Sequence, residues 1–213
     1  MFTSQTYVER RSRLQAKLEG QRGFLFFLGN EESPMNYADN CFPFRQDSSF
    51  LYFLGVDHPG FAGVLDLDEG TTTLFADDLS LDAIVWTGPQ PTVAELASRA
   101  GISATAPAAR LAEILQGAMA QGRPIHFLPP YRPENRLRLL DLLGIAPADQ
   151  AAKASLAFIQ AVIALRIHKN AEEVIEIERA VATTVQMHLA AMRMARPGMK
   201  ESRPPDIGTR NSK

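Results

Sequence analysis

Histidine and cysteine, the side chains that bind metals most often, are few and scattered in this sequence. No histidine stands four residues from another, the spacing that places two imidazoles on one face of a helix. The residues concerned are His58, His126, His168, His188 and Cys41. They fit no common zinc pattern, so the sequence indicates no metal site. Cys41 is expected to be a free, buried thiol in a reducing compartment.

Acidic pairs and hydroxyl groups offer no complete catalytic set either. The acidic pairs lie near the ends of apolar runs, where turns commonly use aspartate. They are Asp66 with Asp68 and Asp77 with Asp78. Ser48 and Ser49 lack the GxSxG context of a hydrolase nucleophile, and the glycines form neither a GxGxxG motif nor a P-loop. The sequence therefore supports no nucleophilic or nucleotide-dependent chemistry.

The stretch FPFRQDSSFLYFLG, residues 42–55, surrounds a polar cluster with aromatic side chains, although aromatic residues make up only 8% of the chain. A buried Arg45 guanidinium would bond to backbone carbonyls of the loop, while Asp47 and the serines bond to nearby amides. The alternative is that Arg45 binds a carboxylate of a ligand, because its planar fork suits such a group. No second basic residue converges on this stretch, so we interpret Arg45 and Asp47 as structural loop residues.

Composition bounds the class of protein. The 213 residues are 46% hydrophobic, enough for one good-sized domain or one domain and part of another. The formal charge of −2 and the absence of a basic stripe disfavour a nucleic-acid partner. The first residues lack the apolar core of a signal peptide, and no apolar run approaches the ~18 residues of a membrane span. We expect a cytoplasmic protein with no membrane partner.

The first half of the sequence predicts one helix followed by strands. Residues 6–18 repeat apolar side chains at helical spacing, and Gly20 follows as a stop. Residues 23–29 are a continuous apolar run, typical of a strand covered on both faces. Further strands are predicted at residues 50–54, 61–67 and 71–75, with a hairpin turn at 68–70. The sheet is expected to be at least partly antiparallel.

From Pro91 onward helices alternate with one strand. Helices are predicted from Thr92, over 108–120, over 133–143 and from Asn170 to Pro197-Gly198, with a short strand at 124–128. Asn170 and Glu173 form a variant of the capping box. The apolar face of the last helix finds no partner in the polar residues 200–213. We expect it to pair with another copy or to pack on its own domain.

Trp86, the only tryptophan, lies in AIVWTGPQP, where an apolar run meets a loop rich in glycine and proline. A large ring at this place is either a plug in the core or an exposed recognition surface. The residue type alone favours burial, because tryptophan is usually mostly buried.

Three motifs together resemble one enzyme family. FPFRQDSSFLYFLG with the following VLDLD resembles the start of the main sheet in the N-terminal domain of aminopeptidase P, prolidase and creatinase relatives. AIVWTG follows in the family's order, and LRIHKNAEEVIEIERAVATTVQMHLAAMRMARPGMKE resembles the junction of the linker helix and the catalytic domain. The likeness runs from about Tyr7 to Glu201. It implies an α/β fold, a mixed β-sheet flanked by helices, followed by a linker and a long helix.

The resemblance also implies domain boundaries. Residues 1–165 would form a non-catalytic α/β domain, and residues 166–199 a linker with the first helix of a truncated catalytic domain. Residues 200–213 depart from the family pattern and are expected to be a disordered tail.

The family's enzymes depend on a pair of divalent metal ions, typically manganese, held in the C-terminal pita-bread domain. No position of this sequence matches those ligands, so the resemblance implies no metal ligand, cofactor or catalytic residue in this chain. It implies an inactive fragment that builds a homo-oligomer and shapes the substrate entrance, with Trp86 reaching a neighbouring subunit's active site. The complete enzyme would act on peptides with proline at the second position.

Two alternatives remain open. One is an interaction module from a family member that has lost catalysis, and the other is the N-terminal part of a creatinase or prolidase.

Overall fold

The structure is a computed structural model that describes residues 2–199. The chain divides into two compact units, Met1–Ile167 and His168–Lys213. The domain boundary that the resemblance places at residue 165 stays a prediction. The expected disordered tail, residues 200–213, lies outside the described residues.

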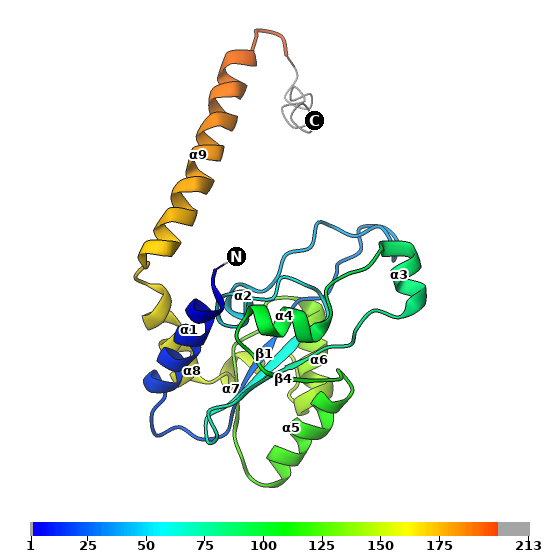
Figure 1. The fold of residues 1–213 in the computed structure, drawn as a ribbon, viewed down its shortest axis with the longest axis vertical. Coiled ribbons are helices and arrows are strands. Elements are labelled where there is room, and N and C mark those ends of the chain that lie inside the picture. The colour runs from blue at the N-terminus through cyan, green and yellow to red at the C-terminus, as the bar shows by residue number, and fades with distance from the viewer. Residues whose placement is uncertain (1, 200–213) are drawn as a thin grey trace. The chain divides into compact units, whose positions relative to one another are not determined.

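A mixed sheet with the strand order β4-β3-β2-β1-β5 forms the centre of the first unit (Figure 1). β1 (Phe24–Leu28) is antiparallel to β2 (Ala62–Asp66) and parallel to β5 (Ile125–Phe127). β3 (Thr72–Phe75) is antiparallel to β2 and parallel to β4 (Ala104–Ala106). The expected fold class, a mixed sheet flanked by helices, is confirmed.

Side chains of β1 alternate between two hydrophobic clusters, one on each face of the sheet. Leu25 and Phe27 join one cluster, and Phe24 and Phe26 join the other. The helices of the first cluster are α1 (Ser4–Lys17), α2 (Ser48–Leu54), α4 (Val93–Arg99) and α8 (Leu156–Arg166). Those of the second are α5 (Arg110–Ala120) and α6 (Pro133–Leu143). Cover on both faces explains why the β1 run is apolar throughout.

Local signals mark the start of α4 and the end of α6 as the sequence predicts. Thr92 and Glu95 form a full capping box at the start of α4. Gly144 closes α6 in the left-handed conformation, with φ of 67°. Two short helices complete the first unit, α3 (Leu81–Thr87) and α7 (Gln150–Lys153).

The predicted strand at residues 50–54 is wrong, because this segment lies in helix α2. Asp47 accepts hydrogen bonds from the backbone N–H groups of Ser49 and Phe50, both at 2.9 Å, and so caps the helix. Gly55, with φ of 67°, ends it, and a Cβ there would meet the Tyr7 ring at 2.6 Å. A short apolar run is compatible with strand or helix, and here the cap decided in favour of the helix.

The second unit consists, within the described residues, of α9 (Ala171–Met194) and the turns around it. Asn170 and Glu173 make both halves of the predicted capping box. One face of α9 carries apolar side chains that are 38–73% exposed. They are Val174, Ile177, Val181, Val185, Leu189 and Met192. Pairing of this face with another copy stays a prediction. Among the described helices, none is both long and apolar enough for a membrane crossing.

Candidate functional site

Within residues 2–199, no group of three or more His, Cys, Asp or Glu side chains could hold a metal ion. His126 is already engaged, since Nδ1 lies 3.0 Å from Ser155 Oγ and Nε2 lies 2.9 Å from the Arg22 carbonyl oxygen. The donor groups described here do not fit a metal centre, so no metal-dependent step is built on them.

Cys41 is partly exposed, which corrects the expectation of a buried thiol. Its Sγ lies 3.3 Å from the Ala38 carbonyl oxygen and 3.9 Å from a Glu32 carboxylate oxygen. Desolvation and then the Glu32 charge raise the pKa of the Cys41 thiol. A protonated thiol is a weak nucleophile, so Cys41 is no candidate for catalysis.

In the aromatic loop at residues 42–55, the buried polar anchor is Gln46, which is 3% exposed. Its Oε1 accepts hydrogen bonds from the N–H groups of Asn30, at 2.7 Å, and Asp47, at 2.9 Å. Its Nε2 donates to the His58 carbonyl oxygen at 2.8 Å. One amide side chain therefore joins the loop to Asn30, two residues after β1, and to the segment before β2.

Asn30 extends this anchor toward α6 and has no solvent exposure. Its Nδ2 donates to the Arg45 carbonyl oxygen at 2.9 Å and to Tyr131 Oη at 3.1 Å. Its Oδ1 accepts from Asn135 Nδ2 at 2.9 Å. The network spans residues about a hundred positions apart, so no local pattern in the sequence could reveal it.

Arg45 itself is exposed, so the prediction of a buried guanidinium is wrong. Only its backbone carbonyl takes part in the loop network, and within residues 2–199 its side chain has no hydrogen-bond or ion-pair partner. A neutral amide can donate and accept without the cost of burying a charge, which is why Gln46 takes the buried position. Asp47 bonds to amides of α2, as described above.

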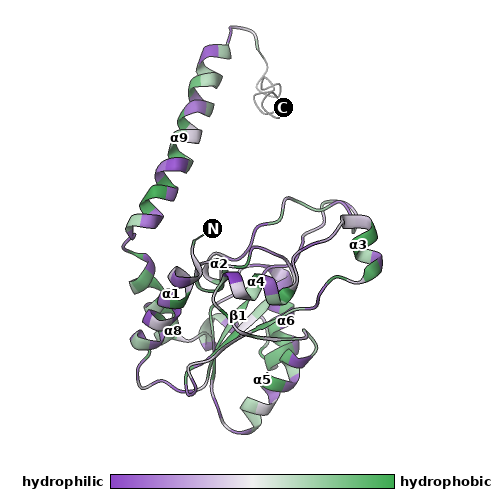
Figure 2. Cartoon of the chain, in the orientation of Figure 1, coloured by the Kyte–Doolittle hydropathy of each residue, from purple (hydrophilic) through white to green (hydrophobic). Residues whose placement is uncertain are grey.

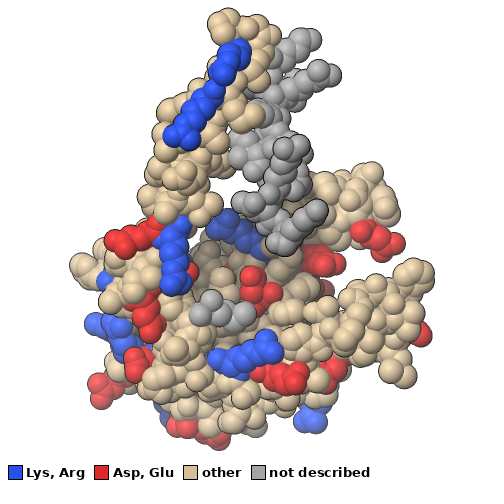
Figure 3. Space-filling view, turned by 45° about the horizontal axis from the view of Figure 1, so that its top comes forward, with Lys and Arg blue, Asp and Glu red and all other residues tan. Residues whose placement is uncertain are grey.

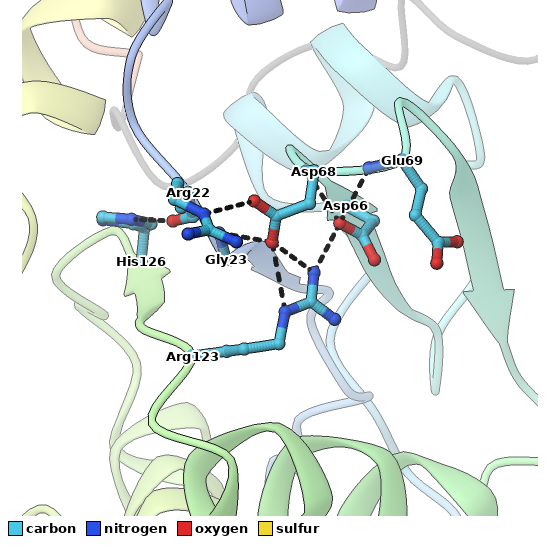
Figure 4. A network of polar contacts seen from close by, with 7 residues as sticks. All are labelled: Arg22, Gly23, Asp66, Asp68, Glu69, Arg123 and His126. Atoms are coloured by element: carbon cyan, nitrogen blue, oxygen red, sulfur yellow. Dashed lines mark hydrogen bonds and ion pairs between the residues drawn. The ribbon is translucent and has the colours of Figure 1, made fainter.

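A second polar network, also missed by the sequence interpretation, ties the β2–β3 turn to the loop before β5 (Figure 4). Arg123 Nη2 lies 2.6 Å from carboxylate oxygens of both Asp66 and Asp68. The guanidinium also stacks on the Phe24 ring, 4.3 Å from its centroid. Hydrogen bonds from Arg123 and then Arg22 lower the pKa of Asp68. Every group here has a protein partner, which indicates a structural role.

Helix α3 is an apolar element of the first unit that the fold leaves exposed. Ser80 caps it by accepting from the Ala83 N–H group, and Gly88 follows its last residue. None of its residues is buried, and Leu81, Val85 and Trp86 are 82%, 80% and 87% exposed. Figure 2 shows this helix largely in the hydrophobic colours. Burial of Trp86, favoured by its residue type, is wrong. Its role at a neighbouring subunit's active site stays a prediction.

Charge does not mark a site on the face shown in Figure 3, where basic and acidic side chains are interspersed. This distribution and the net charge of −2 provide no positive potential on this face that would attract a polyanion. The surface of α3, formed by Leu81, Val85 and Trp86, is therefore the candidate functional site.

Comparison with known proteins identifies the family and the fold. The sequence profile of the aminopeptidase P N-terminal domain matches residues 7–126. This chain belongs to that family. A probable Xaa-Pro aminopeptidase of Chaetomium globosum is 27% identical over 191 residues, which cover 87% of this chain and 30% of the relative. A second, from Talaromyces stipitatus, is 26% identical over 147 residues, 66% of this chain and 29% of the relative.

Solved structures of aminopeptidase P share the fold of this domain. The structure of Pseudomonas aeruginosa aminopeptidase PepP matches with a TM-score of 0.75 at 22% identity. The match covers 93% of this chain and 46% of the PepP chain. The low-pH form of Escherichia coli aminopeptidase P matches with a TM-score of 0.73 at 23% identity. This match covers 93% of this chain and 47% of the E. coli chain. The chain thus spans about 30% of the curated relatives and under half of these structures.

Proposed function

We propose that this chain is the N-terminal, non-catalytic domain of a cytoplasmic metallopeptidase that resembles Xaa-Pro aminopeptidases. Its role is to build a homo-oligomer and to shape the substrate entrance of a neighbouring subunit. The observation that carries this proposal is the 87% exposure of Trp86 on a helix with no buried residue.

An exposed apolar helix of this kind fits a recognition surface. Tryptophan is enriched where proteins bind one another, because its ring brings a large contact area at a low cost in conformational entropy. Ser80 and Gly88 define the ends of α3, so the ring is presented on an ordered turn. Trp86 would supply contact area to a bound peptide, while the chemistry takes place on residues outside those described here.

Metal and substrate chemistry are assigned to the catalytic part of the complete protein. The relatives are named Xaa-Pro aminopeptidases, and one solved relative is a zinc-substituted E. coli aminopeptidase P in complex with product. A pair of divalent ions, manganese in kind, would act there on peptides with proline at the second position. The described residues would contribute no ligand to that pair.

Inactivity of the chain is tested with an Xaa-Pro peptide and added manganese. We expect no turnover, because metal-assisted hydrolysis needs ligands that residues 2–199 do not bring together. Turnover that persists after contaminating peptidases are removed would contradict this part of the proposal.

The role of α3 is tested by sedimentation of the chain and of Trp86→Ala. We expect the substitution to weaken self-association, because Trp86 adds contact area to the interface. Leu137→Ala is the matched control, since Leu137 is also exposed (57%) but lies on α6. Equal behaviour of both variants would remove α3 from the interface. In the complete protein, Trp86→Ala is expected to slow turnover of longer peptides and to leave metal binding intact.

A further inference from the structure

A groove of about 300 Å³ opens between α1 and the first residues of β3 and β4. Six of the eleven residues that line it carry side-chain hydrogen-bond donors, and none of the eleven is an aspartate or glutamate. The donor-bearing residues are Arg11, Ser12, Gln15, Thr71, Thr72 and Ser103. This groove lies in the first unit and shares no residue with α3.

Arg11 is the charged residue of this lining and is only 5% exposed. Its Nη1 donates to the Phe53 carbonyl oxygen, and its Nη2 donates to those of Ala100 and Gly101, all at 2.9 Å. A guanidinium has five N–H groups. Those on Nε and the second on Nη1 have no acceptor in the described part of the protein.

The charge of Arg11 has no counter-ion among residues 2–199, because its partners are neutral carbonyl groups. Burial lowers the pKa of Arg11 to about 10, so the group is still a cation at neutral pH. A buried charge normally has an opposite charge beside it. The groove thus combines a buried cation with neutral donors and lacks a carboxylate to balance it.

The close approach of Gly101 contributes to this arrangement. Gly101 has φ of 64°, and a Cβ at this position would meet Val8 Cγ2 at 2.6 Å. Only glycine allows the backbone to come this near to α1 and to turn its carbonyl oxygen to Arg11. The backbone therefore holds the guanidinium in place before any ligand arrives.

We propose that this groove binds a small oxyanion, the phosphate or carboxylate group of a solute, beside Arg11. Hydroxyl groups of Ser12, Thr72 and Ser103 and the Gln15 amide supply further donors. The groove is open to water, which screens the charge, so the expected Kd is in the millimolar range.

The site is tested by recording amide NMR shifts of the whole chain during titration with inorganic phosphate and, separately, with acetate. Sodium chloride keeps the ionic strength constant. We expect saturable shifts at residues 71–72 and 101–103 with at least one of the two anions, reached by about 20 mM. Phosphate alone would indicate a phosphate ligand, and acetate alone a carboxylate ligand. Shifts with neither anion, or equal shifts with chloride, would overturn the proposal.

Gln15→Glu tests the same site without removing Arg11, whose loss would disturb the fold. The change is isosteric and places a carboxylate in the groove, so the Kd should rise by roughly tenfold or more. Gln116→Glu is the matched control, an exposed helical glutamine on α5 that does not line the groove. An unchanged Kd in Gln15→Glu would place the anion elsewhere and refute the proposal.

Discussion

Helices α2 and α3 have similar local signals at their ends, but the apolar side chains of α2 are buried and those of α3 are exposed. Each has seven residues, begins after a side-chain cap and is followed by glycine, Gly55 or Gly88. In α2, Phe50, Phe53 and Leu54 have no solvent exposure. In α3, Leu81, Val85 and Trp86 are more than three quarters exposed.

The difference shows that apolar content does not by itself place a helix in the core. The side chains of α2 at i, i+3 and i+4 share one face. Asp47 caps the first turn, and the adjacent Gln46 ties the start of the helix to Asn30, which follows β1, and to His58, which precedes β2. The cap of α3 involves only its own first turn. We infer that α2 stabilises the fold and that α3 is available for a partner.

The largest expected effect is that of Phe53→Ala, which should lower the free energy of unfolding by about 3–5 kcal/mol. The Phe53 ring packs 5.6 Å from that of Phe27 and 4.8 Å from that of Tyr52, so its removal leaves a cavity. Trp86→Ala, the matched change in α3, should stay within about 0.5 kcal/mol. Urea unfolding followed by circular dichroism measures both. Equal losses would abolish the contrast between the two helices.

Gln46→Ala tests whether polar anchoring positions α2. The free energy of unfolding should fall by about 1–3 kcal/mol, because the Asn30 N–H group and the His58 carbonyl oxygen lose their partner. The adjacent Arg45→Ala is the control and should stay within about 0.5 kcal/mol, since the Arg45 side chain is exposed. If the same urea experiment showed a larger loss of unfolding free energy for Arg45→Ala than for Gln46→Ala, Arg45 rather than Gln46 would be the residue that anchors the loop.

Removal of the N-terminal cap of α2 or α3 is expected to have a smaller effect on stability. Asp47→Ala should cost about 0.5–2 kcal/mol of global stability, because α2 is part of the core. Ser80→Ala removes the corresponding cap of α3 and should speed amide exchange in α3 alone. Exchange measured by mass spectrometry separates local from global opening. A global loss in Ser80→Ala would show that α3 is coupled to the core.

The last test involves no change in stability. The fluorescence of the Trp86 indole reports directly whether the ring is exposed to solvent. At low protein concentration its fluorescence should be red-shifted and readily quenched by acrylamide, because the side chain is 87% exposed. If α3 is an interface, quenching should weaken as the concentration rises. A blue-shifted emission that resists quenching at every concentration would show a ring buried within one chain.

The sequence by itself determined the elements whose signals are local. The apolar run at residues 23–29 predicted a strand covered on both faces, and Phe24 to Phe27 do alternate between two clusters. The sequence also predicted the Asn170–Glu173 capping box, the end of α6 at Gly144 and the turn after β2. These features depend on hydrogen bonds and backbone angles within a few residues.

Only the tertiary structure decided which polar group is buried and which apolar helix stays outside. Gln46 rather than Arg45 is buried because Asn30 and His58 lie within its reach, and neither neighbour is visible from the loop sequence. Arg11 meets carbonyl groups 89 and 90 residues away. Burial is set by which distant segments come together, whereas propensity and capping act within a turn. The sequence analysis did not predict α3, although its Ser80 cap is a local signal, and only the assembled sheet and its covering helices determined that Trp86 faces solvent.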